Sequence, residues 1–471
     1  MRRYGLVTAS TAFAVVLAMA GPASAATTPP NFDSSAAHGN ESEDAITVNP
    51  TNPSNVVTMA TLPDVVAGLF EGVTFDAGRT WTRRVIGASS ASALGDICCD
   101  QQLAWDHFGN LWMTYLLNST GNVLVALSTD GGLTFTKVAD VVPTSGNGSR
   151  GSGGKRIHTN PNLFGDQPSI SVGASSIWVS YTSVPSQVVQ AFGAPVTGLG
   201  SFGSFSAVQS VPTSAGRGDY GDTAVGPNGQ VLVTYQDAIS GQGGSHIYTA
   251  LDPDGLGPAG FDTPRLLAAS NVGGFDYIPA QQHRSVDAEA NLAWDRSGGP
   301  HTGRVYAVWT NEIGSESDDM DVMLRHSDDS GVTWSPAVRL NDDHTANSQF
   351  MPAIALDQTS GNLAVSWSDA RNDQGAGGTG DTDGIPNNDV QIWATDSTNG
   401  GATFAPNFRV SRGTSNADAA ATFFDYGDYT HAAFQSGTFY PAWSDNSNST
   451  GDNPDGTLHQ LDLYVARVAV R

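Results

Sequence analysis

One short stretch recurs four times in this chain and limits the folds that the sequence can adopt. The pattern is S-x-D-x-G-x-T followed by Trp or Phe, and Ser327–Trp334 matches it throughout. Ser128–Phe135 matches it too, Ser397–Phe404 has Asn399 in place of the Asp, and Thr74–Trp81 begins with Thr. Five specified positions repeated in this way predict one structural unit that is used four times.

The residue types of the pattern predict a braced turn between two strands. Ser and Asp side chains hydrogen-bond to nearby backbone N–H groups in turns. Glycine adopts backbone conformations that a Cβ would penalise, and Thr and aromatic residues favour a strand. We therefore interpret each copy as a hairpin turn, and assign its polar residues to structure rather than to catalysis.

The four stretches resemble Asp-boxes, the BNR repeats of the sialidase superfamily of β-propellers. In that family the Asp-box joins the two outer strands of a blade, on the face away from the active site. The resemblance thus implies the architecture, and it leaves the chemistry to other segments. Family members with sialidase activity have six blades.

A second repeated unit consists of an acidic or amide residue, a strand, a tight turn and a second strand that often ends in Tyr or Trp. Each copy is typical of the inner hairpin of a four-stranded antiparallel blade. The sequence therefore predicts an all-β propeller with seven blades, with six as the alternative. The seven copies are Asp44–Val48 with Val56–Ala60, Asp100–Trp105 with Asn110–Tyr115, Asp166–Val172 with Ile177–Tyr181, Asp222–Val225 with Val231–Tyr235, Glu289–Trp294 with Val305–Trp309, Pro352–Leu356 with Leu363–Trp367, and Tyr429–Phe434 with Phe439–Trp443.

The N-terminal residues predict export from the cell. Met1-Arg-Arg, an apolar run from Ala12 to Ala20 and Ala23-Ser-Ala25 are typical of a secretory signal peptide in residues 1–25. Residues 26–43 are interpreted as a linker and residues 44–471 as the propeller. A strand from residues 26–44, or from the first blade, is expected to complete the last blade. We expect a secreted, extracellular monomer without a membrane span.

Charge and composition narrow the partners. Charged residues make up 14% of the chain, and its formal net charge is −25. Such an acidic balance argues against nucleic acid and against anionic membranes as partners. An extracellular glycan or glycoconjugate is the partner that the family resemblance implies.

The chain has two cysteines, Cys98 and Cys99, and they are adjacent. An oxidising compartment favours a vicinal disulfide. Free buried thiols, or a metal or intermolecular link, are the alternatives.

The loop Asn372–Asp389 is a candidate calcium site. Oxygen ligands at alternate positions around a Gly turn suit Ca²⁺, although loops of this composition are common without any metal. No cofactor is expected to be required. The candidate ligands are Asp381, Asp383, Asn387 and Asp389.

The segments that lead into the predicted inner strands are polar, and in a propeller they would converge on the axis. Asp100, Asp166 and Asp222 are interpreted as one repeated position, either as an acidic ring or as caps of the first strand N–H groups. The candidate catalytic residues are Asp100, Asp166, Glu289, Tyr426, Asp428 and Tyr429. The candidate substrate-binding residues are Arg156, His158, Arg217, Asp222, Arg284, Asp287 and His431.

The family resemblance gives some of these residues roles. A sialidase needs three arginines for the sugar carboxylate, a Tyr activated by a Glu as nucleophile, and an Asp as general acid. By position these would be Arg156, Arg217 and Arg284, then Tyr426 or Tyr429 with Glu289, and then Asp100 or Asp166.

One departure from the family counts against sialidase activity. The family's Arg-Ile-Pro signature is missing, and Glu43-Asp44-Ala-Ile stands in its place. The leading hypothesis is a secreted, sialidase-like glycoside hydrolase with an acidic, Arg- and Tyr-containing axial pocket. The alternative is a non-catalytic propeller that binds carbohydrate or protein.

Overall fold

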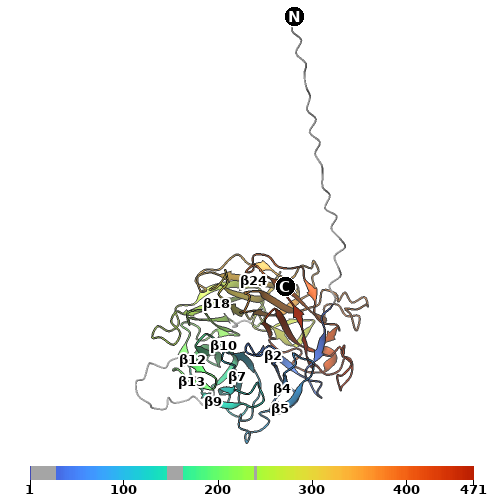
Figure 1. Cartoon of the computed structure of the whole chain (residues 1–471). Coiled ribbons are helices and arrows are strands. Elements are labelled where there is room, and N and C mark those ends of the chain that lie inside the picture. Colours follow the sequence, from blue (N-terminus) through green and yellow to red (C-terminus); the bar gives the residue numbers. More distant parts are fainter. Residues whose placement is uncertain (2–27, 146–162, 238–240, 471) are drawn as a thin grey trace.

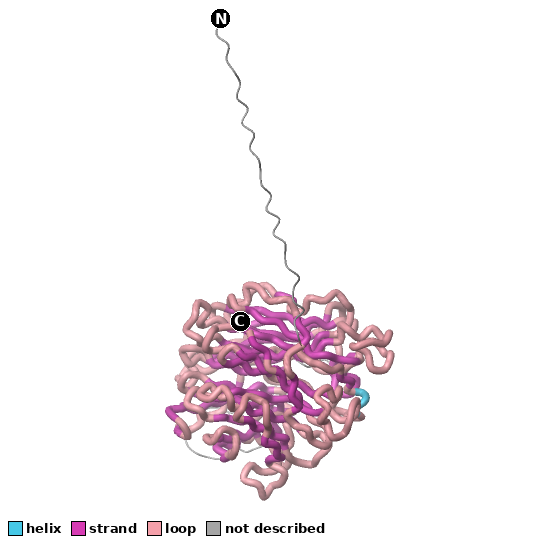
Figure 2. The backbone as a smooth tube through the Cα atoms, turned by 45° about the vertical axis from the view of Figure 1, so that its right-hand side comes forward, coloured by secondary structure: helices cyan, strands magenta, loops and turns pink. Residues whose placement is uncertain are grey.

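The computed structural model describes residues 28–145, 163–237 and 241–470, together with Met1. The fold is all-β, and within these residues the only helix is one short 3₁₀ turn, η1 (Asp418–Ala420). Seven antiparallel sheets of four main strands surround a common axis, so the predicted seven-bladed propeller is confirmed. Figure 1 shows β2 and β10 nearer the middle of the molecule than β5, β9 and β13. Strands and loops make up nearly all of the backbone in Figure 2.

The first four blades follow one another along the chain, each from its inner to its outer strand. Blade one contains β2 (Ser42–Val48), β3 (Val56–Thr61), β4 (Leu69–Thr74) and β5 (Thr82–Ile86). Blade two contains β6 (Gln102–Trp105), β7 (Leu111–Leu116), β8 (Val123–Ser128) and β9 (Thr136–Val141). Blade three contains β10 (Phe164–Val172), β11 (Ser176–Val184), β12 (Val188–Gly198), β13 (Ser201–Phe202) and β14 (Gln209–Ser210). Blade four contains β15 (Gly218–Asp219), β16 (Thr223–Val225), β17 (Val231–Asp237), β18 (Ser245–Asp252) and β19 (Arg265–Ser270).

A two-stranded ribbon, β20 (Asp276–Ile278) and β21 (Gln281–Val286), precedes the last three blades. Blade five contains β22 (Asn291–Trp294), β23 (Val305–Glu312), β24 (Met320–Ser327) and β25 (Val338–Arg339). Blade six contains β26 (Gln349–Leu356), β27 (Leu363–Asp369), β28 (Asp389–Ser397), β29 (Phe408–Arg409) and β30 (Ser415–Asn416). Blade seven contains β31 (Ala432–Gln435), β32 (Thr438–Asp445), β33 (Asp462–Ala466), β34 (Val468–Ala469) and the N-terminal strand β1 (Asn31–Asp33).

The ring is closed by β1, which pairs antiparallel with β33 through Asn31–Ala466, Phe32–Val465 and Asp33–Tyr464. The expectation that a strand from residues 26–44 completes the last blade is therefore confirmed. The same pairing corrects the linker interpretation of residues 26–43, because part of this stretch is an outer strand. The pairing gives β33 a neighbouring strand and holds the two ends of the chain together in one blade.

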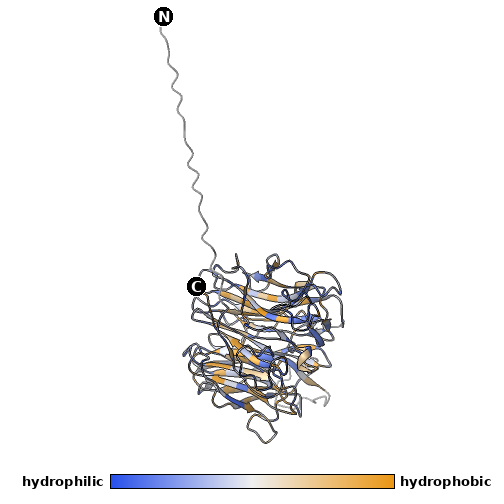
Figure 3. Ribbon diagram, turned by 90° about the vertical axis from the view of Figure 1, so that its right-hand side faces the viewer, coloured by the Kyte–Doolittle hydropathy of each residue, from blue (hydrophilic) through white to orange (hydrophobic). Residues whose placement is uncertain are grey.

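The blades pack on each other through apolar side chains that alternate along the strands. Figure 3 shows the hydrophobic segments concentrated within the strands. Large aromatic residues near the ends of second strands pack between blades, among them Trp309, Trp367 and Trp443, each at most 3% exposed. This recurrence supports a packing role for these rings. None of the described helical residues forms a segment long and apolar enough to cross a membrane.

The four repeated stretches form the braced turns that their sequence predicts. In Ser327–Trp334, Asp329 accepts hydrogen bonds from the Thr333 N–H at 2.8 Å and from the Thr333 hydroxyl at 2.7 Å. The Ser327 hydroxyl accepts from the Gly331 N–H at 2.8 Å. Asn399 makes the corresponding contact, since its side-chain oxygen accepts from the Thr403 N–H at 3.0 Å. The brace is therefore kept when Asn replaces Asp.

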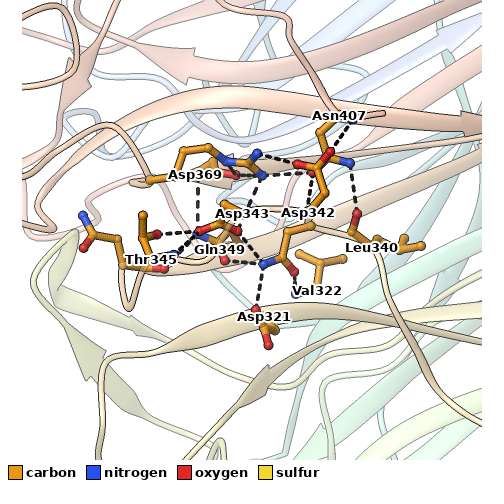
Figure 4. Close-up of polar contacts among 12 residues, drawn as sticks. Asp321, Val322, Leu340, Asp342, Asp343, Thr345, Gln349, Asp369 and Asn407 are labelled. Carbon is orange, nitrogen blue, oxygen red and sulfur yellow. Dashed lines mark hydrogen bonds and ion pairs between the residues drawn. The ribbon is translucent and has the colours of Figure 1, made fainter. Parts of the chain in front are cut away.

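Polar networks also join neighbouring blades, as at the junction of blades five and six (Figure 4). Arg371 donates to Asp369, Asp342 and Asn407 at 2.9–3.0 Å. Its guanidinium also lies over the ring of Trp393, 4.2 Å from the centroid. This arginine is 9% exposed and is satisfied inside the protein, so its role is structural.

Candidate functional site

In five of the seven blades, a non-glycine residue in the left-handed conformation lies within the first half of the inner strand or shortly before it. Each of these residues lies five positions before the inner-strand residue that forms the last cross-strand pair before the hairpin turn. Their φ angles lie between 41° and 58°. The residues are Glu43, Asp100, Gln167, Tyr220 and Met351. Register shifts mark β-bulges at this point in β2, β10 and β26. Bulges re-aim side chains and are frequent beside active sites, and left-handed non-glycine residues cost free energy that functional sites often retain. The propeller therefore directs one residue from each of several blades to the same end of its axis.

This register corrects the interpretation that Asp100, Asp166 and Asp222 share one repeated position. Counted from the hairpin pairs, Asp166 stands one residue before the left-handed position and Asp222 stands two residues after it. Asp100, Asp166 and Asp222 stand five, six and three residues before the last pair of their hairpins, so aligning them by residue type places them wrongly.

A pocket of about 440 Å³ opens at this end of the axis, and its walls differ in chemistry. Its polar wall consists of Glu43, Asp100, Asp166 and Arg284. Its apolar wall is formed by Cys98, Cys99, Leu116, Leu117, Leu163, Phe164 and Phe424. The phenyl ring of Phe164 is on the rim, where this residue is 45% exposed.

Cys98 and Cys99 are joined by a disulfide, so of the alternatives considered for this pair the vicinal disulfide is confirmed. The bridge borders the pocket immediately before Asp100 in the chain. The main chain around it is held by blade two, since the Cys98 N–H donates to the Leu116 carbonyl at 3.0 Å and the Leu116 N–H donates to the Cys99 carbonyl at 3.2 Å. The disulfide thus forms a fixed apolar surface next to a carboxyl group.

The ribbon β20–β21 carries Arg284 to the pocket. Its guanidinium donates to the Asp428 carboxylate, lies 3.6 Å from the Glu43 carboxylate and covers the ring of Phe424 at 4.8 Å. Asp425, which is buried, accepts hydrogen bonds from the N–H groups of His283 and Arg284 at 2.7 and 3.0 Å. The segment before blade seven therefore fixes both the backbone and the charge of Arg284.

The carboxyl groups of the polar wall have raised pKa values. Burial raises the pKa of Asp166 to about 8, with further contributions from Asp219 and Asp428. Burial, followed by the Asp166 charge, raises the pKa of Asp100 to about 7. Burial, followed by Asp100, raises the pKa of Glu43 to about 8, and Arg284 opposes part of each shift. Desolvation disfavours the charged form, and like charges that share a site cannot all ionise.

Below the pocket, a small cavity on the axis is lined by Asp287, Glu289, Asp428 and Tyr429. Burial raises the pKa values of Asp287, Glu289 and Tyr429 well above their usual range. A tyrosine whose pKa is raised is a poor nucleophile at neutral pH. These residues therefore extend the acidic cluster, but Tyr429 does not have the environment of an activated tyrosine.

Several residues predicted for the site lie elsewhere. The hydroxyl of Tyr426 is buried in the core and donates to Ser415 at 3.3 Å. Arg217 lies over Tyr248 in the third strand of blade four, 5.1 Å from the ring centroid. Arg156 and His158 are outside the described residues. Of the three arginines expected for a sugar carboxylate, the described part of the chain brings Arg284 alone to the pocket.

Asp222 and His431 line a second pocket, of about 250 Å³, at the other end of the axis. Asp222 accepts from the Thr223 N–H at 2.7 Å and the Leu292 N–H at 2.8 Å, and thereby ties blade four to blade five. His431 contacts the Asp44 carbonyl at 2.9 Å, and burial lowers its pKa to about 4. Asp222 therefore caps backbone N–H groups, which is the alternative role considered for Asp100, Asp166 and Asp222.

The predicted calcium loop brings together a slightly different set of carboxylates. Asp373, Asp381 and Asp389 have oxygens within 4.8 Å of one another. Asp383 instead accepts from Asn388 and Asn416 at 2.9 and 3.1 Å, and the Asn387 oxygen accepts from the Ser348 N–H. A Ca²⁺ ion would have Asp373, Asp381 and Asp389 as ligands, because hard oxygen donors suit this ion.

Three residues of the site escaped the sequence-based selection. Glu43 occupies the left-handed position of blade one. Its position directly before the first predicted inner strand could have identified it as a site residue. Asp219 stands one residue before the left-handed Tyr220 of blade four, where burial raises the pKa of Asp219 to about 6. Gln167 donates to Asp428 at 3.3 Å, and its N–H donates to Asp100 at 3.1 Å.

Comparisons with known proteins agree with the fold. No protein-family model and no curated protein sequence matches the chain. Among solved structures, the BP39L lectin from Burkholderia pseudomallei has 11% identity and a TM-score of 0.52, covering 92% of this chain and 97% of the lectin. The α-L-arabinanase of Penicillium chrysogenum has 13% identity and a TM-score of 0.44 over 78% of this chain and 96% of the arabinanase. The Hadza microbial sialidase Hz136 has 13% identity and a TM-score of 0.44 over 88% of this chain and 73% of the sialidase.

The fold and the site together define a class: a seven-bladed β-propeller with an acidic pocket at one end of its axis. At these identities the likeness concerns the fold, and function has to be argued from the site.

Proposed function

We propose that the protein is a secreted glycoside hydrolase that acts on an extracellular glycan in the axial pocket. The observation that carries the proposal is the shape of that pocket, in which an apolar wall faces buried carboxyl groups. A pyranose ring has the matching character, since its C–H face is apolar and its hydroxyl edge needs hydrogen-bond partners. A pocket of about 440 Å³ lies in the range typical of small-ligand sites.

The carboxyl groups suit glycoside hydrolysis. The reaction needs one carboxylic acid that protonates the departing glycosidic oxygen, and one carboxylate that attacks the anomeric carbon directly or activates water. Asp166 is assigned as the acid because its raised pKa, about 8, keeps it protonated at neutral pH. Asp100 has the lower pKa of the two, about 7, so it loses its proton first and is assigned as the base or nucleophile.

Arg284 supports this pair electrostatically. Its charge lowers the pKa values of Asp100 and Asp166 and is itself stabilised by Asp428. The disulfide and Leu117 exclude water from one side of the pocket, which strengthens every electrostatic interaction inside it.

A panel of fluorogenic glycosides, including a sialoside, tests the proposal. We expect turnover of at least one substrate and a 10²–10⁴-fold loss of kcat in Asp166→Asn, the range of about 10²–10⁴ that general acid catalysis supplies. Asp140→Asn, on the outer strand of blade two, is the matched control and should retain turnover. No turnover on any substrate, with glycan binding retained, would identify a non-catalytic propeller.

A further inference from the structure

The axial site contains many more acidic than basic side chains. Seven carboxyl groups from six blades, or from the segments directly before them, meet there: Glu43, Asp100, Asp166, Asp219, Asp287, Glu289 and Asp428. Each electrostatically affects at least one other of the set. Among the described residues of this cluster, Arg284 is the single permanent cation, and it is shared between Asp428 and Glu43.

One buried acceptor in the wall of the pocket lacks a hydrogen-bond donor. Glu43 Oε1 has no hydrogen-bond partner, although the Arg284 guanidinium lies 3.6 Å from it, and Glu43 is 1% exposed. A buried acceptor without a donor destabilises the protein. A ligand that brings N–H donors and positive charge to the pocket would satisfy this atom, whereas a ligand carboxylate would add one more acceptor.

The arrangement fits an organic cation better than a metal ion. A metal needs several oxygens close together, and in the described part of the chain the group that meets this condition is Asp373, Asp381 and Asp389, on blade six. The axial carboxyl groups instead border a pocket of about 440 Å³ that has a disulfide and Phe424 on its opposite wall. Such a space takes a ring with one charged substituent.

We infer that the axial pocket recognises a sugar with a free ammonium group, such as an unacetylated hexosamine unit, and excludes sugars with a carboxylate. The inference rests on the proposed function, because it names the substrate class of the same pocket. The ammonium group has three donors and no acceptor, so it complements the Glu43 side of the pocket. The sugar ring lies against the disulfide.

Protonation gives this inference a second signature. The raised pKa values of Glu43 and Asp100 mean that these two groups hold protons in the free protein. A bound cation favours the charged forms of Glu43 and Asp100, so binding releases protons and tightens as the pH rises. A neutral sugar would show little of this dependence.

Calorimetric titration tests the inference with an Asp166→Asn variant, so that binding is measured apart from hydrolysis. The probes are chitosan tetrasaccharide, its fully N-acetylated counterpart and sialyllactose. We expect the deacetylated oligosaccharide to bind at least tenfold more tightly than the acetylated one, and sialyllactose not to bind. Between pH 5.5 and 7 the affinity for the deacetylated probe should rise, with proton release.

Glu43→Gln, added to this variant, should reduce the preference for the deacetylated probe, whereas Asp140→Asn should leave it unchanged. Equal or tighter binding of the acetylated or sialylated probe, or no binding of any probe, would overturn the inference. If the deacetylated probe binds more tightly but the wild type hydrolyses no glycoside, the glycosidase proposal alone is rejected. If the wild type hydrolyses a glycoside but the deacetylated probe binds no more tightly than the acetylated one, this inference alone is rejected. Thermal unfolding of each variant separates misfolding from lost recognition.

Discussion

Arg284 forms an ion pair with Asp428, and this contact joins the ribbon between blades four and five to the segment that begins blade seven. The two residues are 144 positions apart in the chain. Their meeting on the axis holds a positive charge within the acidic pocket, and it makes the geometry of the pocket depend on closure of the whole ring.

Removal of this arginine should destabilise the protein and change its acid–base behaviour. Arg284→Met leaves Asp428 and Glu43 without their partner, and we expect a loss of about 1–3 kcal/mol in unfolding free energy, as for other unpaired buried groups. The exposed pair of Lys137 with Asp140 provides the control, because such pairs contribute about 0–1 kcal/mol. Urea denaturation of Arg284→Met and Lys137→Met measures the difference, and equal losses would contradict a special role of Arg284.

Turnover should fall as the pH rises through about 8. The proposed acid, Asp166, has a pKa of about 8 and must be protonated to act. Below this pH the group carries its proton, and above it the group is charged and cannot donate. The pH dependence of kcat measures this limb. A rate that stays constant from pH 7 to 10 would remove Asp166 from the role of acid.

Stability should also fall with rising pH, because the native state holds protons that the unfolded chain releases. Where β1 meets β33, burial raises the pKa of Asp33 to about 6 and that of Asp462 to about 11, and it raises the pKa of Glu41 well above its usual range. Their folded pKa values exceed the unfolded values near 4, so stability declines as pH rises from about 4 to 8.

Thermal unfolding at pH 5 and pH 8 measures this dependence. In Asp462→Asn the decline should be smaller, since one buried carboxyl group no longer has to ionise. An unfolding temperature that rises from pH 5 to pH 8 in the wild type would show that these groups ionise without cost in the native state.

Loss of the N-terminal strand should open the ring. Deletion of residues 1–35 removes β1, the outer strand paired with β33, and leaves the edge of blade seven unpaired. We expect loss of a cooperative thermal transition, followed by circular dichroism. Deletion of residues 1–25 is the control and should unfold as the full chain does. A cooperative transition in the longer deletion would show that closure does not need β1.

A braced turn should matter for stability and leave activity unchanged. Asp329→Ala removes the acceptor of both Thr333 donors, and about 1–2 kcal/mol should be lost with these hydrogen bonds. Asp329→Asn should cost less, since Asn399 supports the same turn in blade six. Chemical denaturation gives the order, and kcat measured in parallel should not change.

The blades could be predicted from sequence because their signals are local. Strand alternation, turn residues and the braced Asp329-type turns depend on neighbouring residues, and all seven inner hairpins were placed correctly. The left-handed residues could not be predicted, because in the five blades that have one it is Glu, Asp, Gln, Tyr or Met, with no residue type in common. Asp166 and Asp222 were aligned wrongly because residue type, and not the distance from the hairpin pairs, was followed.

The site was predicted in part for the same reason. Asp100, Asp166, Arg284 and Asp428 were selected from polar lead-in segments, and the fold brings them together. Tyr426 and Arg217 come from similar segments but turn into the core and onto blade four, respectively. Which way such a residue turns is decided by contacts with distant blades, and these contacts leave no trace in the local sequence.

The most direct test of the central claim is a crystal structure of Asp166→Asn with the best-bound oligosaccharide. A sugar ring against the Cys98–Cys99 disulfide, with its glycosidic oxygen within hydrogen-bond distance of residue 166, is the predicted result. Density for the sugar at the opposite mouth of the axis, beside Asp222 and His431, or on the outer surface of the blades, would contradict it.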